Sequence, residues 1–222
     1  MLKMLSTVAV AAATSLVSLP AAAEFMDFQV SEGSVPGTPD NTITADKING
    51  SFVEWVTLDG LGGFTASAYA QFTSFLADEG ATSVSAYLNN FGDTGYRMYA
   101  LFSASGTVSG LNFTGLTGQF DLYIDADNNT TFTQTGGGSG TGFTVTGTTA
   151  DDYKIAFTTT LTSGTGTLTA APGAYDFKFT DFTLTDDGKL YFTEPDPFYI
   201  NVQVNGDNDA FTGTNPIRVT GD

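Results

Sequence analysis

The sequence contains neither cysteine nor histidine, and it has few basic residues. Without cysteine, no disulfide, thiolate nucleophile or sulfur-ligated metal site can form. Without histidine, the chain has no Ser-His-Asp triad, no Cys-His pair and no histidine-ligated zinc, copper or iron. These two absences leave most hydrolase and redox mechanisms without the residues that they need.

Positive charge is scarce: 7 basic residues stand against 24 acidic ones, and the formal net charge is -17. Nucleic acid is excluded as a partner on this ground, because phosphate binding needs a basic surface. An anionic membrane surface is excluded for the same reason. We interpret the acidity as a source of solubility, with attraction of divalent cations in a matrix as the alternative.

The N-terminus has the pattern of a secretory signal peptide. Lys3 supplies the positive charge, an alanine-rich apolar run covers residues 5–16, and Pro20 ends it before three alanines at 21–23. We therefore expect residues 1–23 to be removed and the mature chain to begin at Glu24. The apolar run is shorter than the roughly 20 residues that cross a bilayer, so we expect no transmembrane anchor in this chain.

The rest of the chain has the patterns of strands and turns. Residues 153–158 and 175–179 alternate between apolar and polar side chains, which is typical of half-buried strands. Residues 64–72 place small alanines in the middle of an apolar face, which would let another element pack close. The sequence Asp186-Asp187-Gly188 between two strand patterns predicts a hairpin turn. The glycine-rich residues 134–142 predict a mobile surface connection.

One short helix is expected after Thr82 or Ser83, because apolar residues at 84, 87, 88 and 91 follow a helical spacing. The remaining elements are strands separated by turns. We therefore predict that residues 24–222 form a single antiparallel β-sandwich domain with one short helix, and a β-barrel is the alternative. The edge strands of an open sandwich would also permit self-association.

Asp125, Asp127 and Asn129 form the sharpest local signal for a bound ion. Oxygen ligands at alternate positions resemble the start of a calcium loop, although the glycine and the bidentate acid of an EF-hand loop are missing. A polar turn is the alternative interpretation, because Asp and Asn favour turns. Residues 205–209 form a second acidic cluster that could supply the other half of a site. We expect calcium to bind weakly if it binds, and no other cofactor.

Catalysis would require a pair of carboxylates in a cleft, and no motif selects such a pair. Glu54, between Val53 and Trp55 in an aromatic strand, is the best candidate for a proton donor. We expect the protein not to be an enzyme, and a glycan-active enzyme is the third hypothesis for its function.

Several short segments resemble the flocculation-associated PEP-CTERM proteins of Gram-negative bacteria. These segments are residues 31–37 (SEGSVPG), 45–54 (ADKINGSFVE), 65–72 (TASAYAQF), 95–102 (GYRMYALF) and 196–200 (DPFYI). The resemblance implies a secreted protein that promotes cell aggregation within an exopolysaccharide matrix. The Pro-Glu-Pro motif, apolar helix and basic residues that end this family are not found here, so we expect either a truncated chain or a freely secreted relative.

We therefore expect a protein of the extracellular matrix or cell surface of a Gram-negative bacterium. Its partners would be exopolysaccharide, other matrix components or further copies of itself. The runner-up is a calcium-dependent carbohydrate-binding module.

Overall fold

The computed structural model describes residues 25–90, 94–138, 140–147, 152–167, 169 and 173–222. The expected signal peptide lies outside the described residues. In the part of the chain that is described, no helix is long and apolar enough to cross a membrane.

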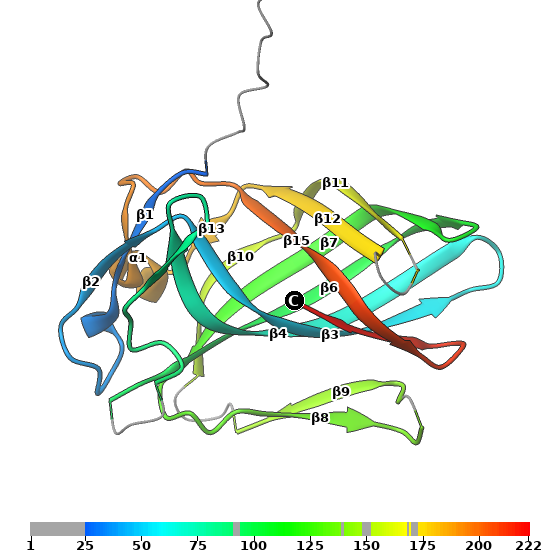
Figure 1. Ribbon diagram of the computed structural model, residues 1–222, viewed down its shortest axis with the longest axis horizontal. Coiled ribbons are helices and arrows are strands. Elements are labelled where there is room, and N and C mark those ends of the chain that lie inside the picture. The colour runs from blue at the N-terminus through cyan, green and yellow to red at the C-terminus, as the bar shows by residue number, and fades with distance from the viewer. Residues whose placement is uncertain (1–24, 91–93, 139, 148–151, 168, 170–172) are drawn as a thin grey trace, which may run out of the picture.

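The fold is all-β, as predicted, and its main sheet closes on itself to form an eight-stranded antiparallel barrel (Figure 1). Of the two architectures considered, the barrel forms and the sandwich does not. In pairing order the barrel strands are β3 (Lys47–Leu58), β4 (Gly63–Ala77), β6 (Arg97–Ser109), β7 (Asn112–Asp125), β11 (Thr160–Thr167), β12 (Gly173–Thr180), β15 (Val202–Thr212) and β16 (Ile217–Gly221).

Strand β7 is the point at which the barrel closes. Its first residues pair with β11, where Thr114 lies opposite Thr165. Its last residues pair with β10 (Asp152–Thr158), which continues to the two-residue strand β13 (Thr183–Leu184). One edge of β7 therefore serves two partners in succession, and the barrel wall branches there.

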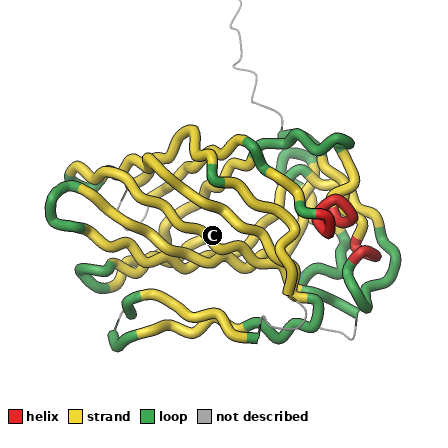
Figure 2. Tube along the Cα trace, turned by 180° about the vertical axis from the view of Figure 1, so that it is seen from behind, coloured by secondary structure: helices red, strands yellow, loops and turns green. Residues whose placement is uncertain are grey.

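The remaining elements lie at one end of the barrel or against its outer wall (Figures 1 and 2). The end cap consists of the three-stranded sheet β14-β1-β2 with the helices η1 and α1. Its bounds are β1 (Phe28–Ser31), η1 (Glu32–Ser34), β2 (Thr42–Ala45), α1 (Asp186–Tyr191) and β14 (Phe192–Glu194). A short strand, β5 (Thr82–Val84), pairs with β4, and β8 (Thr131–Thr135) with β9 (Gly142–Thr146) forms a separate hairpin.

The alternation predicted from the sequence places aromatic and small side chains inside the barrel. On β4, Phe64, Ala66 and Ala68 are buried, while Ser67 between them is half-buried on the outer face. The phenylalanines Phe177 and Phe179 of β12 fill the opposite wall. This is the period-two pattern of strands that wrap a core.

The end cap is fastened to the barrel by Glu32, which is fully buried. Its Oε1 accepts hydrogen bonds from the backbone N–H groups of Tyr87 (2.8 Å) and Leu88 (3.2 Å) and from the hydroxyl of Tyr96 (3.0 Å). Its Oε2 accepts one from the Asn41 amide. Four donors thus satisfy the carboxylate, which is the condition under which a buried charge is tolerated.

The network continues into α1 through the hydroxyls of Tyr96 and Tyr191, which lie 2.5 Å apart. Burial is the main cause that raises the pKa of both hydroxyls far above its usual value. Both tyrosines therefore stay neutral well above neutral pH, and they keep their protons for hydrogen bonding.

The helix predicted near residues 82–91 does not form in the described part of that segment. Thr82–Val84 is the strand β5, and Val84 pairs with Phe75 of β4. Phe91 lies outside the described residues. Tertiary pairing has overridden the helical spacing, as it commonly does for short segments.

The helix forms instead where the hairpin turn was predicted, at Asp186–Tyr191. The Thr185 side chain accepts a hydrogen bond from the Gly188 N–H (3.0 Å), which caps the helix. Two aspartates in the first turn interact favourably with the positive end of the helix dipole and so stabilise the helix. The strand β12 ends at Thr180, and the chain then pairs with β10 through β13 before the helix begins.

The barrel seam requires glycine at position 164. Gly164 is buried, and a Cβ at this position would lie 2.7 Å from the Phe177 ring, which is itself packed in the core. We expect Gly164→Ala to lower the free energy of unfolding by about 1–3 kcal/mol, the usual effect of overpacking. Urea denaturation would measure it. Gly137→Ala, which enters open space, is the matched control, and an equal effect of both would contradict the seam argument.

The Glu32 network predicts a large and graded loss of stability. Glu32→Ala leaves four donors without an acceptor and should lower the free energy of unfolding by about 3 kcal/mol or more. Glu32→Gln should lose less, because the Asn41 amide can turn its oxygen toward the new amide group. Glu194→Ala, at an exposed position, should change stability by less than about 0.5 kcal/mol. Equal stability of the Ala and Gln variants at position 32 would refute the network.

Candidate functional site

An aromatic stripe crosses the outer wall of the barrel. We define it as Trp55 of β3, Tyr69 of β4, Tyr99 of β6 and Tyr123 of β7. Neighbouring rings are in contact: the Trp55 and Tyr69 centroids lie 6.4 Å apart, and Tyr99 stacks on Tyr123 at 5.0 Å. The Arg218 guanidinium lies over the Trp55 ring at 5.8 Å. Outward aromatic side chains of this kind need a cover, because they would otherwise expose a large apolar surface.

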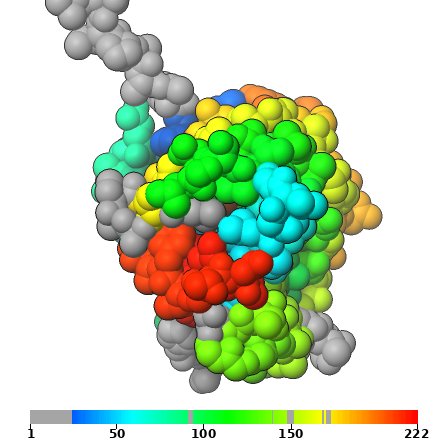
Figure 3. Space-filling model, turned by 90° about the vertical axis from the view of Figure 1, so that its right-hand side faces the viewer, coloured from blue at the N-terminus to red at the C-terminus, as the bar shows by residue number. Residues whose placement is uncertain are grey.

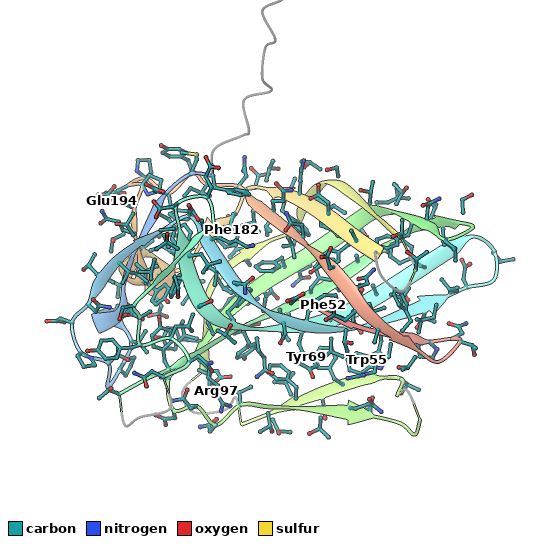
Figure 4. The ribbon with its side chains drawn as sticks, viewed as in Figure 1. Phe52, Trp55, Tyr69, Arg97, Phe182 and Glu194 are labelled. Atoms are coloured by element: carbon teal, nitrogen blue, oxygen red, sulfur yellow. The ribbon has the colours of Figure 1, made fainter. Side chains whose placement is uncertain are left out.

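The β8–β9 hairpin supplies that cover (Figures 3 and 4). Phe132 stacks on Tyr69 with ring centroids 4.2 Å apart and contacts Tyr99 edge-on at 5.3 Å. Phe143 stacks on Trp55 at 5.7 Å. Figure 4 shows Trp55 and Tyr69 lying between the barrel wall and the hairpin. The hairpin pairs with no other described strand, so side-chain packing holds it in place.

The sequence of the hairpin explains this arrangement. Phe132 and Val145 are cross-strand partners on the inner face, while Thr131 and Thr146 share the outer face and join their hydroxyls at 2.7 Å. Sequence analysis missed the hairpin because residues 134–142 were interpreted as a mobile connection. The signal was the alternation of threonine with an apolar residue on both sides of the glycines.

A polar groove of about 260 Å³ opens where the hairpin meets the barrel wall. Ser51, Gln71 and Thr73 contribute its polar side from β3 and β4. The rings of Tyr99 and Phe132 contribute its aromatic side. Arg97, Asn89 and the start of the β7–β8 connection close it. The groove therefore combines hydrogen-bonding groups with aromatic surface, as small-ligand sites commonly do.

Asp125 lies at the end of β7, directly opposite Arg97 on β6. The Asp125 side chain is fully buried. Its Oδ1 accepts a hydrogen bond from the Asn129 N–H (3.1 Å) and its Oδ2 accepts one from the Thr130 N–H (3.0 Å). Asp125 thus closes the turn that follows β7, which is the turn interpretation of this motif.

The three residues of the predicted calcium site differ in their exposure to solvent. Asp125 is buried, whereas Asp127 and Asn129 are exposed. Calcium would have to compete with two backbone N–H groups for the Asp125 carboxylate. Among the described residues, no group of three or more acidic side chains could hold a metal ion.

The second acidic cluster is not a turn, because residues 205–209 lie within β15. Asn208 is buried there and its amide donates to the Thr167 carbonyl at 3.0 Å. The strands β11 and β12 lie between β15 and β7 in the pairing order. The two clusters therefore belong to different parts of the barrel.

Asp152 lies behind the groove and binds two of the residues that line it. Its Oδ2 accepts hydrogen bonds from the Tyr99 hydroxyl (2.8 Å) and from Thr130 Oγ1 (2.6 Å). Its Oδ1 is buried and has no hydrogen-bond partner among the residues that the structure describes. Burial, with the bond to Asp152, raises the pKa of the Tyr99 hydroxyl well above its usual value, so Tyr99 remains a neutral donor.

Glu54, the candidate proton donor, lies on the other face of β3 from Trp55 and lines a cavity inside the barrel. The groove and Glu54 are thus separated by the barrel wall. The arrangement expected for a glycosidase, with two carboxylates flanking one cleft, is not formed by Glu54 and the groove.

Comparisons of the chain with protein-family models, with curated proteins and with solved structures find no significant match.

The contact between the hairpin and the stripe can be followed through Trp55, the single tryptophan of the chain. Trp55 is buried under Phe143. We expect Phe143→Ala to expose the indole, shift its emission to longer wavelength and increase quenching by acrylamide. Thr144→Ala, at the adjacent exposed position, is the control and should leave the emission unchanged. If Phe143→Ala also left it unchanged, the hairpin would not cover the stripe in solution.

Proposed function

We propose that this protein is a secreted matrix protein that binds exopolysaccharide through the groove beneath the β8–β9 hairpin and so promotes cell aggregation. The observation that carries the proposal is the composition of the groove: hydroxyl and amide side chains on one side, and the rings of Tyr99 and Phe132 on the other. Export is inferred from the N-terminal sequence pattern, and the role in aggregation from the resemblance to flocculation-associated proteins.

A sugar residue suits this groove for reasons of shape and chemistry. Its hydroxyl groups both donate and accept hydrogen bonds, as do the side chains of Gln71, Asn89 and Thr73. Its C–H faces are apolar and can pack on an aromatic ring. The volume of about 260 Å³ lies just below the roughly 300 Å³ at which sites for drug-sized ligands begin. A single sugar residue of a longer chain is therefore the appropriate occupant.

The charge of the protein restricts the polysaccharide. A formal net charge of -17 repels polyanions at low ionic strength. Arg97 is the single basic side chain among the described residues of the groove, and it lies opposite Asp125. We therefore infer a neutral or amino-substituted polysaccharide, and we expect acidic polymers such as alginate to bind more weakly.

Electrophoresis of the purified protein through gels that contain exopolysaccharide from the producing cells would test this proposal. We expect the polymer to retard the wild type, and Gln71→Ala to weaken the affinity about tenfold, the equivalent of one hydrogen bond of about 1.4 kcal/mol. Gln203→Ala is the matched control, because this glutamine lies on β15 and bonds Asp176. Equal retardation of wild type and Gln71→Ala, or none of either, would contradict the proposal.

The same gels distinguish the runner-up, a calcium-dependent carbohydrate-binding module. Loss of retardation in a chelator, restored by calcium and abolished by Asp127→Ala, would support calcium dependence. Retardation that persists in the chelator would support binding of the polysaccharide by the groove without calcium. Adding the mature protein to a deletion strain then tests aggregation itself, and restored aggregation without consumption of polysaccharide is the expected result.

A further inference from the structure

A small cavity of about 50 Å³ lies inside the barrel, and the strand register explains why it exists. Glu54, Ala68, Phe102 and Phe120 are successive cross-strand neighbours on β3, β4, β6 and β7. In the next row Phe52 pairs with Ala70, and Ala70 pairs with Ala100. The three alanines, Ala68, Ala70 and Ala100, are too short to reach the opposite wall. The alanines of residues 64–72 predicted close packing of another element, and two of them, Ala68 and Ala70, border a cavity instead.

Aromatic rings surround the cavity on the remaining sides. Phe52 contacts Tyr175 at 5.0 Å and Phe102 contacts Phe177 at 5.1 Å, both edge-to-face. Phe120 and Tyr69 also line the cavity. The face of an aromatic ring carries partial negative charge, so a cavity bordered by several rings favours a positively charged occupant.

Among the described residues that line the cavity, Glu54 is the single acidic one and none is basic. Glu54 is half-buried, and its carboxyl group receives no hydrogen bond from the described residues. Burial raises its pKa to about 7. The hydroxyl of Tyr175 is a titratable neighbour of Glu54. Its pKa is raised first by burial and then by the negative charges of Glu54, Asp222 and Asp207. All of these neighbours are acidic or neutral, so no described cation compensates Glu54.

We propose that this cavity is a binding site for a small protonated amine, with the ammonium group paired to the Glu54 carboxylate and its methyl group against the surrounding rings. The volume permits only a few heavy atoms, since a cavity needs about 10–15 Å³ of accessible volume to hold one water. Methylammonium is of this size. The proposal does not depend on the groove, which lies on the other side of the barrel wall.

Other occupants satisfy this cavity less well. Calcium and magnesium need about six oxygen ligands, and the cavity offers one carboxylate. A neutral molecule offers no counter-charge, so Glu54 would be ionised beside the rings only at the cost of its raised pKa of about 7. Water can hydrogen-bond Glu54 but gains nothing from the ring faces. A small organic cation is the occupant that matches both the acid and the rings.

The sign of the pH dependence follows from the raised pKa of Glu54. Folding raises this pKa from 4.5 to about 7, so the folded protein binds the proton more tightly than the unfolded chain does. Without an amine, the free energy of unfolding should therefore fall as the pH rises between these two values. A bound amine favours the ionised carboxylate, so amine affinity should increase over the same range and level off above pH 7.

Carboxyl NMR of protein labelled at glutamate would test the site. The Glu54 titration is recorded in methylammonium chloride and in sodium chloride of equal ionic strength. Methylammonium at ten times its dissociation constant should lower the Glu54 pKa by about one unit. Methanol, the neutral analogue, should leave it unchanged. Coincident titration curves in the two salts would overturn the proposal, and so would an equal effect of methanol.

Two variants test the charge and the volume of the site separately. Glu54→Gln removes the charge and should weaken methylammonium binding at least tenfold in calorimetry. Ala100→Leu keeps Glu54 but fills the cavity, and it should abolish the methylammonium-dependent shift of the Glu54 pKa. Glu194→Gln, at an exposed position, is the control and should bind as the wild type does. Undiminished binding by folded Glu54→Gln or folded Ala100→Leu would refute the assignment.

Discussion

The structure depends on the way in which β7 divides one edge between two partners. Residues 112–114 pair with β11 and close the barrel, and residues 120–125 pair with β10. The chain between β7 and β10 is then free to leave the wall, and it forms the β8–β9 hairpin. The groove exists because the hairpin lies back on the wall near the point of departure. Closure also gives each barrel strand a partner on both sides, and in the described structure strands such as β2 and β13 keep one open edge.

The strand patterns could be predicted from the sequence, but the way in which the strands pair could not. Alternation in residues 64–72 and 175–179 identified β4 and β12, and it is confirmed by the inward Phe64 and Phe177. A sandwich and a barrel give the same alternation, because each has one buried face. The contact that separates them, Thr114 opposite Thr165, joins segments far apart in the sequence. No local pattern records such a contact.

The errors at the two helices have a common physical origin. Val84 follows a helical spacing, but it forms a strand that pairs with Phe75 on β4. Asp186-Asp187-Gly188 is a good turn sequence, and it is equally the first turn of a helix when Thr185 caps it. What decides between the two is Tyr191, whose hydroxyl must reach Tyr96 and the Glu32 network. Similarly, Asp125 has the residue type of a metal ligand, and only its burial makes it a turn-closing side chain.

The two candidate sites use opposite faces of the same strands. Glu54 points into the cavity and Trp55 lies under the hairpin, while Ala68 and Tyr69 repeat this division on β4. A single layer of strands separates the two sites, so a shift of the backbone at one site also moves the side chains that line the other. Tyr69 is the closest link, because it borders the cavity while its ring stacks on Phe132 of the hairpin. Contacting residues of this kind rarely act independently. Alternation along a strand, the feature most easily read from the sequence, is therefore also what brings an interior acid and an exterior groove within one residue of each other.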